Sequence, residues 1–276
     1  MTIPPHIQTI VLQGSLGTRR GTSESVSALF LEAKAACGER SEKLISHLLE
    51  KFTFLNNEKY DEAIDSIAKW LDESGLLTPE TVFCATSMGH EKDSAQRVLY
   101  DVSTALGMRG HLKIRTYNLA DKLHKADRVR NVVFVDEFTG TGETIASRIE
   151  TVGSRFKQAG KDTPEFHVSL VAGMEKAMER VETVAASSMV VYRLKPGLSG
   201  YMNGADLLEA LQQMEVFEDR LEQVFSDLDL PRLGWGKAEA LYSRHRGNCP
   251  NNVFPIFWWP ASKGNILRKP IFPRTF

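Results

Sequence analysis

The stretch NVVFVDEFTGTGET, residues 131–144, decides the fold of this chain. It begins with an apolar run, and a continuous apolar run is typical of a buried parallel strand. Two carboxylates, Asp136 and Glu137, follow the run, and a loop of Thr and Gly residues then leads into a helical pattern. Backbone N–H groups at a helix N-terminus bind phosphate, while carboxylates hold sugar hydroxyls or Mg²⁺. The stretch therefore predicts a site for a phosphorylated, hydroxyl-rich ligand.

Strands and helices alternate around this stretch. Apolar runs predict strands over residues 81–85, 112–117, 131–135, 166–172 and 189–192. Apolar residues at helical spacing predict helices over 91–108 and 142–159. Such alternation indicates an α/β fold with a parallel sheet flanked by helices, whose ligands bind at the carboxyl ends of the strands. The loop after the first core strand, residues 86–90, is therefore expected beside residues 136–144.

The rest of the chain divides around this core. Helical spacing over 41–52 and 60–71 predicts N-terminal helices, and an amphipathic pattern predicts a long helix over 205–225. After that helix the chain turns irregular and rich in aromatic residues. The predicted organisation is an N-terminal helical region (1–80), an α/β core (81–195) and a C-terminal helix with an aromatic and basic lid (196–276).

Composition limits the class of protein. A chain of 276 residues with 42% hydrophobic and 25% charged residues has ordinary globular composition, and no apolar run approaches the roughly 20 residues of a membrane helix. The N-terminus lacks the charged start and long apolar core of a signal peptide. Three widely spaced cysteines give neither a metal spacing nor a disulfide framework. We therefore expect a cytoplasmic protein without a membrane segment.

The net charge of −1 hides two uneven segments. Residues 205–230 carry eight acids and one base, whereas residues 231–276 carry eight bases and one acid. Either these segments dock on each other, or the basic one faces a polyanion. Residues 113–130 are also basic; such a run is usually a solvated face, but Arg128 and Arg130 lie just before the 131–135 strand, where they could reach an anionic ligand.

Residues 132–144 resemble the phosphate and ribose signature of type I phosphoribosyltransferases. The resemblance implies that Asp136 and Glu137 hold Mg²⁺ and the ribose hydroxyls of phosphoribosyl pyrophosphate (PRPP), and that the following loop holds the 5-phosphate. The matching loop positions are Thr139, Gly140, Thr141, Gly142, Glu143 and Thr144. Two of them depart from the family, because some members carry Asp where Gly140 stands, and Glu143 places a carboxylate beside the phosphate. A P-loop is disfavoured because it needs Gly at position 137 and Lys at position 143.

The same resemblance implies that the loop after the first core strand contacts pyrophosphate. The matching positions are Ser87, Met88, Gly89 and His90, of which Ser87, Gly89 and His90 are the candidate site residues. His90 could equally cap the following helix or face solvent. The resemblance also implies that the segment between the second and third core strands closes over the pyrophosphate.

The C-terminal tail makes the resemblance more specific. Residues 248–258, NCPNNVFPIFW, and residues 270–274, PIFPR, resemble a phosphoribosyltransferase-like family of bacterial conflict systems, which includes effectors encoded beside retron reverse transcriptases. The resemblance spans about residues 40–276 and implies that the tail lies over the carboxyl edge of the sheet. The candidate contacts to base or pyrophosphate are Arg244, His245, Asn248, Asn251 and Asn252. The alternatives are that the Asn residues form turns, and that Phe254, Phe257, Trp258 and Trp259 fill a core.

Two functions from different classes follow. As an enzyme, the protein would be a toxic effector of antiphage defence that binds PRPP or a nucleotide with Mg²⁺ and transfers or hydrolyses a phosphoribosyl or glycosidic bond. As a module without catalysis, it would bind a nucleotide together with nucleic acid or a protein partner, for example a reverse transcriptase and its RNA–DNA hybrid. A nucleoside hydrolase or deoxyribosyltransferase is a third reading, which the phosphate loop disfavours.

Overall fold

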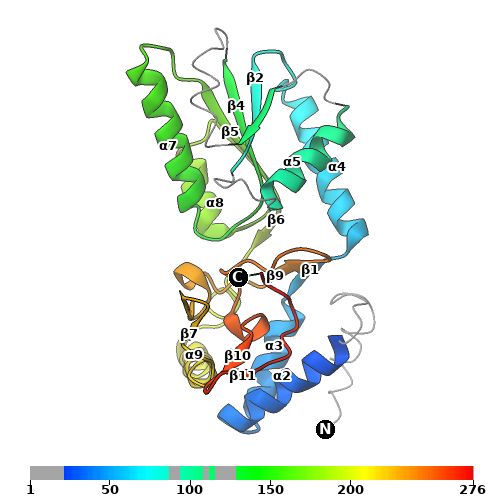
Figure 1. Ribbon diagram of the computed structural model, residues 1–276, viewed down its shortest axis with the longest axis vertical. Coiled ribbons are helices and arrows are strands. Elements are labelled where there is room, and N and C mark those ends of the chain that lie inside the picture. Colours follow the sequence, from blue (N-terminus) through cyan, green and yellow to red (C-terminus); the bar gives the residue numbers. More distant parts are fainter. Residues whose placement is uncertain (1–21, 87–93, 108–111, 116–128, 276) are drawn as a thin grey trace. The chain divides into compact units, whose positions relative to one another are not determined.

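The computed structural model of the chain describes residues 22–86, 94–107, 112–115 and 129–275. The chain forms two compact units (Figure 1). The sheet unit is Lys59–Leu194, and the terminal unit combines Met1–Glu58 with Lys195–Phe276. The sequence predicted three successive regions; the structure groups the chain differently, because the two ends belong to one unit and the predicted 1–80 region is divided between both.

The sheet unit is built on five parallel strands in the order β3-β2-β4-β5-β6. The strands are β2 (Thr81–Ala85), β3 (Leu112–Arg115), β4 (Asn131–Thr139), β5 (Glu165–Met174) and β6 (Ser187–Leu194). The helices are α4 (Asn57–Glu73), α5 (Ser94–Ala105), α7 (Glu143–Gln158) and α8 (Glu175–Glu182). β4 lies at the centre, between β2 and β5. The expected α/β class with a parallel sheet flanked by helices is confirmed.

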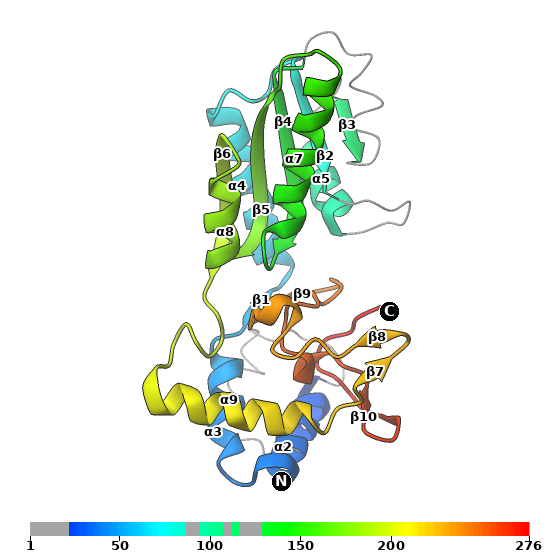
Figure 2. The same ribbon diagram turned by 90° about the vertical axis from the view of Figure 1, so that its left-hand side faces the viewer.

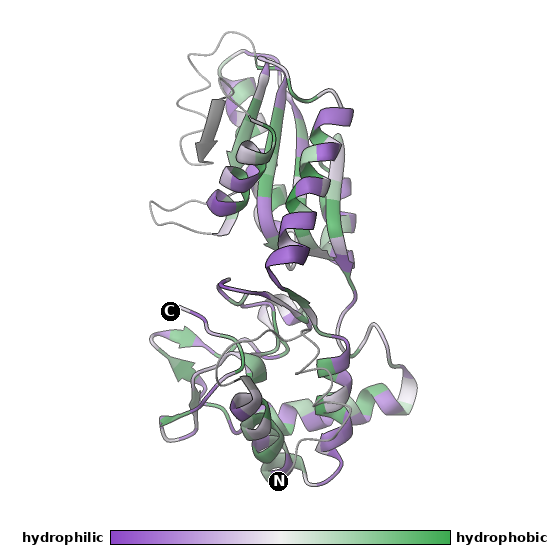
Figure 3. Cartoon of the chain, turned by 90° about the vertical axis from the view of Figure 1, so that its right-hand side faces the viewer, coloured by the Kyte–Doolittle hydropathy of each residue, from purple (hydrophilic) through white to green (hydrophobic). Residues whose placement is uncertain are grey.

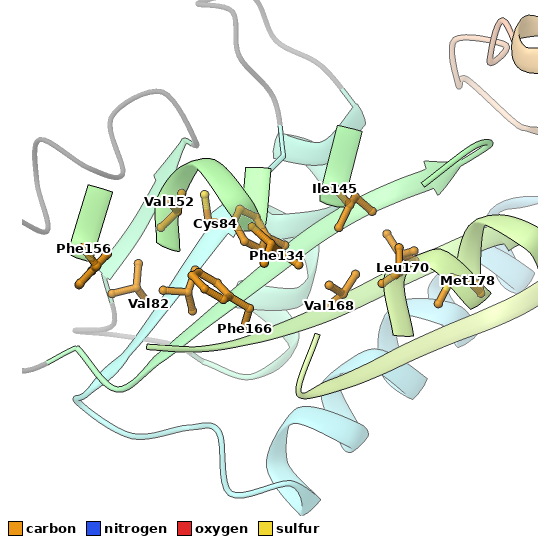
Figure 4. Close-up of a cluster of buried hydrophobic side chains, with 13 residues drawn as sticks. Val82, Cys84, Phe134, Ile145, Val152, Phe156, Phe166, Val168, Leu170 and Met178 are labelled. Atoms are coloured by element: carbon orange, nitrogen blue, oxygen red, sulfur yellow. The ribbon is translucent and has the colours of Figure 1, made fainter. Parts of the chain in front are cut away.

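One face of the sheet packs against α7 and α8 (Figure 4). Val132 and Phe134 of β4 alternate onto this face, where Ile145 and Phe156 of α7 meet them. The strands form a continuous hydrophobic band between more polar helix surfaces (Figure 3). Each fully buried side chain of this kind contributes roughly 1.5–3 kcal/mol. This packing fixes β4 and α7 relative to each other, and therefore the loop that joins them.

The opposite face is covered by α4 and α5 (Figure 1). The apolar residues of α4 that recur at helical spacing are buried, among them Ile64, Ile67 and Leu71. The hydroxyl of Tyr60 in α4 donates to Oδ2 of Asp101 in α5 at 2.9 Å. The helix predicted over 60–71 is therefore present as part of α4. All of α4 except its first two residues, 57 and 58, belongs to the sheet unit.

The terminal unit is built from an N-terminal and a C-terminal part of the chain (Figure 2). Its helices are α2 (Thr22–Cys37), α3 (Ser41–Glu50) and α9 (Gly204–Glu218), and α2 packs on both of the others. Its strands are β1 (Thr53–Leu55), β7 (Val224–Phe225), β8 (Leu228–Asp229), β9 (Tyr242–Arg244), β10 (Ala261–Ser262) and β11 (Ile266–Leu267). Its described residues also form two short 3₁₀ helices, η1 (Trp235–Lys237) and η2 (Pro255–Phe257). β1 pairs in parallel with β9, so residues far apart in sequence share one ladder.

The helix predicted over 205–225 is too long at its C-terminal end. α9 ends at Glu218, whose buried carboxyl group accepts the N–H of Leu233 at 3.0 Å. The chain then enters the β7–β8 hairpin, where Phe225 lies against Trp259 with their ring centroids 6.4 Å apart. These tertiary contacts end the helix even though apolar residues continue at helical spacing.

The aromatic residues of the tail fill the core of the terminal unit. The side chains of Phe254, Phe257, Trp258 and Trp259 are almost fully buried. Both indole N–H groups are satisfied at 2.8 Å, that of Trp258 by the Val253 carbonyl and that of Trp259 by the Glu222 carbonyl. This burial is what the core-filling alternative predicts. None of the helices in the described ranges combines the length and hydropathy that a bilayer-spanning helix requires.

Candidate functional site

The candidate site is formed where β4 passes into α7. β4 ends at Thr139 and α7 begins at Glu143, so Gly140, Thr141 and Gly142 make the turn. Gly142 has a φ of +74°, a left-handed conformation that glycine adopts without strain. The predicted strand, acid pair, loop and helix therefore occur in the expected order, and the helix starts within one residue of its predicted boundary.

Asp136 is held by donors from two strands. The hydroxyl of Thr86, which directly follows β2, donates to Oδ2 of Asp136. The backbone N–H of Glu137 donates to Oδ1 of Asp136 at 2.6 Å. The Asp136 side chain is half-buried, so it is oriented by the protein and still reaches the surface. Thr86 was not among the predicted site residues, although its position directly after the first core strand could have indicated it.

The two adjacent carboxylates differ in their surroundings. Neighbouring residues of a strand point to opposite faces of the sheet, so Asp136 and Glu137 face opposite ways. The side chain of Glu137 is only 1% exposed, in contrast to that of Asp136. The sequence predicted that both carboxylates act as ligands. In the structure the Asp136 side chain is accessible to solvent, whereas that of Glu137 is buried.

The loop and the first turn of α7 present backbone donors. The first N–H groups of a helix have no acceptor within the helix. Among the described residues, no hydrogen bond takes the N–H of Gly142 or Thr144 as its donor, whereas the N–H of Glu143 reaches the Thr141 hydroxyl at 3.4 Å. The side chain of Thr139 is buried, and that of Thr144 is exposed. This end of the sheet therefore offers N–H groups and a hydroxyl to an anion, at the positive end of a helix dipole.

The Glu143 carboxylate is paired within the protein. Nη1 of Arg180 in α8 lies 3.0 Å from Oε1 of Glu143 and also donates to the Thr141 carbonyl at 3.3 Å. Both side chains are about half exposed, so the pair adds little stability by itself. The ion pair nevertheless gives the negatively charged Glu143 side chain a positively charged partner on α8. Arg180 was missed by sequence reasoning, because nothing in the local pattern around it points to the loop.

The other predicted residues of this region divide into two groups. Ser87, Gly89, His90 and Arg128 lie outside the described residues. Arg130 precedes β4 at the amino end of the strand, where its Nε pairs with Glu80 at 2.9 Å. Six residues of extended chain separate it from Asp136, which is about 20 Å at about 3.3 Å per residue. The structure therefore does not bring Arg130 to the loop.

The predicted Asn residues of the tail belong to the terminal unit. Oδ1 of Asn248 accepts the N–H of Thr275 at 3.0 Å. Nδ2 of Asn252 donates to the Trp235 carbonyl at 2.8 Å, and the carbonyl of Asn251 accepts the Trp235 N–H at the same distance. Asn251 and Asn252 lie in a turn, as the turn-forming alternative predicts, whereas Asn248 does not, and the side chains of Asn248 and Asn252 bond to residues distant in sequence.

Arg244 and His245 also lie in the terminal unit. Arg244 ends β9 and is buried, and its Nη1 donates to the His245 carbonyl at 3.3 Å. The His245 N–H extends the β1–β9 ladder by donating to the Leu55 carbonyl at 2.8 Å. The backbone of both residues thus takes part in the pairing of β9 with β1.

The uneven charges of the C-terminal segments are partly neutralised within the terminal unit. Arg232 pairs with Asp219, which joins the basic segment to the acidic one. The buried guanidinium of Arg268 pairs with Glu32 of α2. Arg274 lies over the Trp258 ring, with its guanidinium carbon 5.1 Å from the centroid, and burial lowers the pKa of this guanidinium. The self-docking alternative therefore accounts for part of the charge pattern.

A surface cavity of about 450 Å³ follows α3 in the terminal unit. Its lining is mostly charged, in contrast to the apolar walls typical of small-molecule sites. The lining residues are Glu39, Glu42, Lys43, Ser46, His47 and Glu50. Within the described ranges, no group of three or more His, Cys, Asp or Glu side chains is arranged to hold a metal ion. The β4–α7 loop remains the best-formed candidate site.

Comparison with known families gives one match. A family model described as PRTase-CE matches residues 38–274, which includes the β4–α7 loop and the aromatic tail. No curated protein matches the chain.

Proposed function

Because the chain belongs to the PRTase-CE family, which is phosphoribosyltransferase-like, we propose that its β4–α7 loop binds the phosphoribosyl group of PRPP or of a nucleotide. The observation that carries the proposal is the junction itself. A left-handed Gly142 precedes α7, so that the backbone N–H groups at the helix N-terminus follow closely on the Asp136 carboxylate near the end of β4. Phosphate is bound by helix N-terminal N–H groups and sugar hydroxyls by carboxylates, so these two kinds of group suit the two parts of the ligand.

Each part of the ligand has a chemically matched partner. The phosphate would accept hydrogen bonds from the loop N–H groups and from the exposed Thr144 hydroxyl. The ribose hydroxyls would donate to Asp136, whose orientation Thr86 fixes. Glu137, being buried, would support the end of the strand rather than contact the sugar. This division of roles refines the simple assignment of both acids to the ribose.

The residues fit a magnesium ion that arrives with its ligand. Mg²⁺ is usually held by one or two carboxylates together with substrate phosphates, and it keeps several waters. Asp136 supplies one such carboxylate, and the described residues offer no cage of three side chains. A bound Mg²⁺ would neutralise charge on a pyrophosphate group. The protein's own contribution is to orient Asp136 and the loop donors.

The reaction that suits this site is transfer or hydrolysis at the anomeric carbon of the phosphoribosyl group. A site of this kind lowers the barrier by holding the sugar in place and by stabilising charge that develops as the leaving group departs. The donors that hold the 5-phosphate contribute to positioning. Turnover of PRPP or of a nucleotide, with release of ribose 5-phosphate in the hydrolytic case, is the activity we propose to assay.

The first experiment is calorimetric titration of the full chain with PRPP plus Mg²⁺, with ribose 5-phosphate and nucleoside monophosphates alongside. The comparison variant is Asp136→Asn, which keeps the shape and removes the charge. We expect a measurable affinity in the wild type that is lost in the variant while both proteins unfold at similar temperatures. Absence of binding to every one of these ligands in the wild type would refute the proposal.

We further propose that the protein acts as a toxic effector of an antiphage defence system, such as one associated with a retron. The support is the resemblance of residues 248–258 and 270–274 to such effectors, and the family match extends over both segments. Expression of the wild type should slow growth of a bacterial host, and the Asp136→Asn, Glu137→Gln double variant should not. Equal toxicity of a well-folded double variant would contradict a role for this site.

The second candidate is a regulatory module that binds a ligand without turning it over. The observation in its favour is the Glu143 carboxylate beside the loop, together with Gly140 where some relatives carry Asp. Its proposed partners are nucleic acid, such as an RNA–DNA hybrid, or a protein such as a reverse transcriptase. Nucleic-acid binding should weaken steeply with salt, and binding that ignores salt would exclude the phosphate-driven version.

A further inference from the structure

Arg180 connects α8 to two consecutive parts of the loop. Its Nη1 donates to the Thr141 carbonyl at 3.3 Å and lies 3.0 Å from Oε1 of Glu143. Both contacts are made by this one nitrogen, and the two residues that it contacts lie on either side of Gly142 in the sequence. A single side chain from another helix thus contacts the peptide before the glycine and the carboxylate after it.

The contact with Thr141 fixes the direction of a peptide plane. The described peptide bonds are all trans, and in a trans peptide the C=O and the next N–H point in opposite directions. The Thr141 carbonyl points to Arg180, so the N–H of Gly142 points away from it. That N–H is one of the loop donors for which the described residues provide no acceptor. Arg180 therefore orients a donor that it does not touch.

The backbone of α8 restricts the same loop independently. A Cβ atom built on Gly142 would lie 2.7 Å from the carbonyl oxygen of Ala177, one turn before Arg180. That distance is shorter than van der Waals contact allows, so only glycine fits against the helix. The loop is thus held from its α8 side by backbone contact as well as by the guanidinium.

The contact with Glu143 orients the negative charge of this side chain. A carboxylate in the first turn of a helix is favoured by the helix dipole, but it repels a phosphate bound at the same helix end. Pairing with Arg180 holds the Glu143 carboxylate toward α8 and supplies a compensating positive charge.

We propose that Arg180 is a positioning residue of the phosphate loop, which directs the Gly142 N–H toward the ligand and holds the Glu143 carboxylate away from it. The proposal rests on the proposed function, since it concerns phosphate bound at this loop. Arg180 acts through Thr141 and Glu143 and need not contact the ligand.

The test uses the full chain with Arg180→Ala, Arg180→Lys and the double variant Arg180→Ala, Glu143→Gln. The matched control is Lys176→Ala, which removes the same charge from an exposed position on the same helix. The probe is ribose 5-phosphate, titrated by calorimetry. We expect Arg180→Ala to weaken binding about tenfold, as for loss of one charge-assisted contact, and the double variant to recover part of that loss. Arg180→Lys should retain part of the affinity, and Lys176→Ala should bind like the wild type.

A second readout is independent of the ligand. The amide signal of Gly142 in a ¹⁵N-labelled sample should shift, and its hydrogen exchange should change, in Arg180→Ala but not in Lys176→Ala. Wild-type affinity together with an unchanged Gly142 amide in Arg180→Ala would overturn the inference while leaving the proposed function intact. If the wild type binds no phosphate ligand, the proposed function fails and the inference about ligand positioning falls with it. The amide comparison then still decides whether Arg180 sets the peptide plane.

Discussion

The Thr86 hydroxyl donates to Oδ2 of Asp136, and this bond ties the carboxyl end of β2 to the acid at the end of β4. The two residues are 50 positions apart in the chain and are brought together by the parallel pairing of the strands. The second carboxylate oxygen accepts the Glu137 N–H, so both oxygens of Asp136 have donors within the protein. The orientation of Asp136 is therefore set before any ligand binds.

Replacing Thr86 with Val removes the donor and keeps the shape of the side chain. We expect Thr86→Val to weaken the affinity for PRPP or a nucleotide about tenfold, because a hydrogen bond to a charged group is worth roughly 1.5–3 kcal/mol and part of this orients Asp136. Thr86→Ser keeps the hydroxyl and should bind nearly as the wild type does. Calorimetric titration measures all three proteins. Equal affinities for Thr86→Val and Thr86→Ser would show that the bond does not position Asp136.

The two ends of α7 allow a matched test of the loop. Gly142 and Gly160 flank the helix, and both have positive φ angles, +74° and +65°. A Cβ on Gly142 would meet α8, whereas nothing lies within 4 Å of a Cβ on Gly160. Gly160→Ala should therefore cost only backbone strain, about 1 kcal/mol. Gly142→Ala should add an overpacking cost of about 1–3 kcal/mol.

Chemical denaturation measures the free energy of unfolding of both variants. Gly142→Ala should also weaken ligand binding, because α8 or the loop must shift to admit the methyl group. Gly160→Ala should leave the affinity unchanged. Equal destabilisation by the two substitutions would mean that the close approach of the loop to α8 is relaxed in solution.

The sheet and its central loop could be predicted because their signals are local. β4 is a continuous apolar run, and α7 repeats apolar residues at helical spacing. β1 and α8 have three and eight residues, too few to show a period, and both were missed. The grouping of the chain ends into one unit depends on the pairing of β1 with β9, which no local pattern encodes.

The residues of the candidate site also fall into those with a local sequence signal and those without one. The acid pair and the Gly/Thr loop are adjacent in sequence and were identified together. Thr86 and Arg180 reach them from other elements, 50 and 39 residues away from their partners, and were not identified. Arg130 was considered a candidate ligand contact because it lies just before the strand that carries the acid pair, with a solvated face as the alternative. Because β4 is extended, residues a few positions apart in sequence lie far apart along the strand, and Arg130 is at the opposite end of β4 from the loop.

The Arg268 side chain should be a major determinant of stability in the terminal unit. It is only 3% exposed, and it donates to Glu32 of α2 and to the carbonyls of Trp259 and Ile256. Removing one partner of a buried ion pair leaves groups unsatisfied, so we expect Arg268→Ala to cost about 3 kcal/mol. Its neighbour Lys269 pairs with Glu24 at the surface, 3.8 Å away, with both side chains about three-quarters exposed. Lys269→Ala should lie within about 0.5 kcal/mol of the wild type. Denaturant unfolding compares the two, and a small effect at Arg268 would show that the tail is held mainly by its aromatic core.

The last prediction concerns the buried carboxyl of Glu218 at the end of α9. Burial is the main cause that raises its pKa from 4.5 to about 8, and the N–H of Leu233, which it accepts, opposes the shift. Between these two pH values the unfolded chain has released the proton and the folded chain retains it. The free energy of unfolding should therefore fall as the pH rises from about 4.5 to about 8, by up to about 1.4 kcal/mol per pH unit from this group, and level off above that range.

Glu218→Gln isolates this contribution from that of other groups. Burial lowers the pKa of His167, so His167 has the opposite effect and reduces stability as the pH falls through its unfolded value of 6.5. The glutamine keeps a neutral acceptor for the Leu233 N–H and cannot ionise, so the variant should gain stability over the wild type as the pH rises toward 8. Asp206→Asn, at an exposed position of the same helix that is not among the charges acting on Glu218, should follow the wild type at every pH. Denaturant unfolding of the three proteins between pH 5 and pH 9 measures the difference, and a wild type that runs parallel to Glu218→Gln would place the Glu218 carboxyl in contact with water.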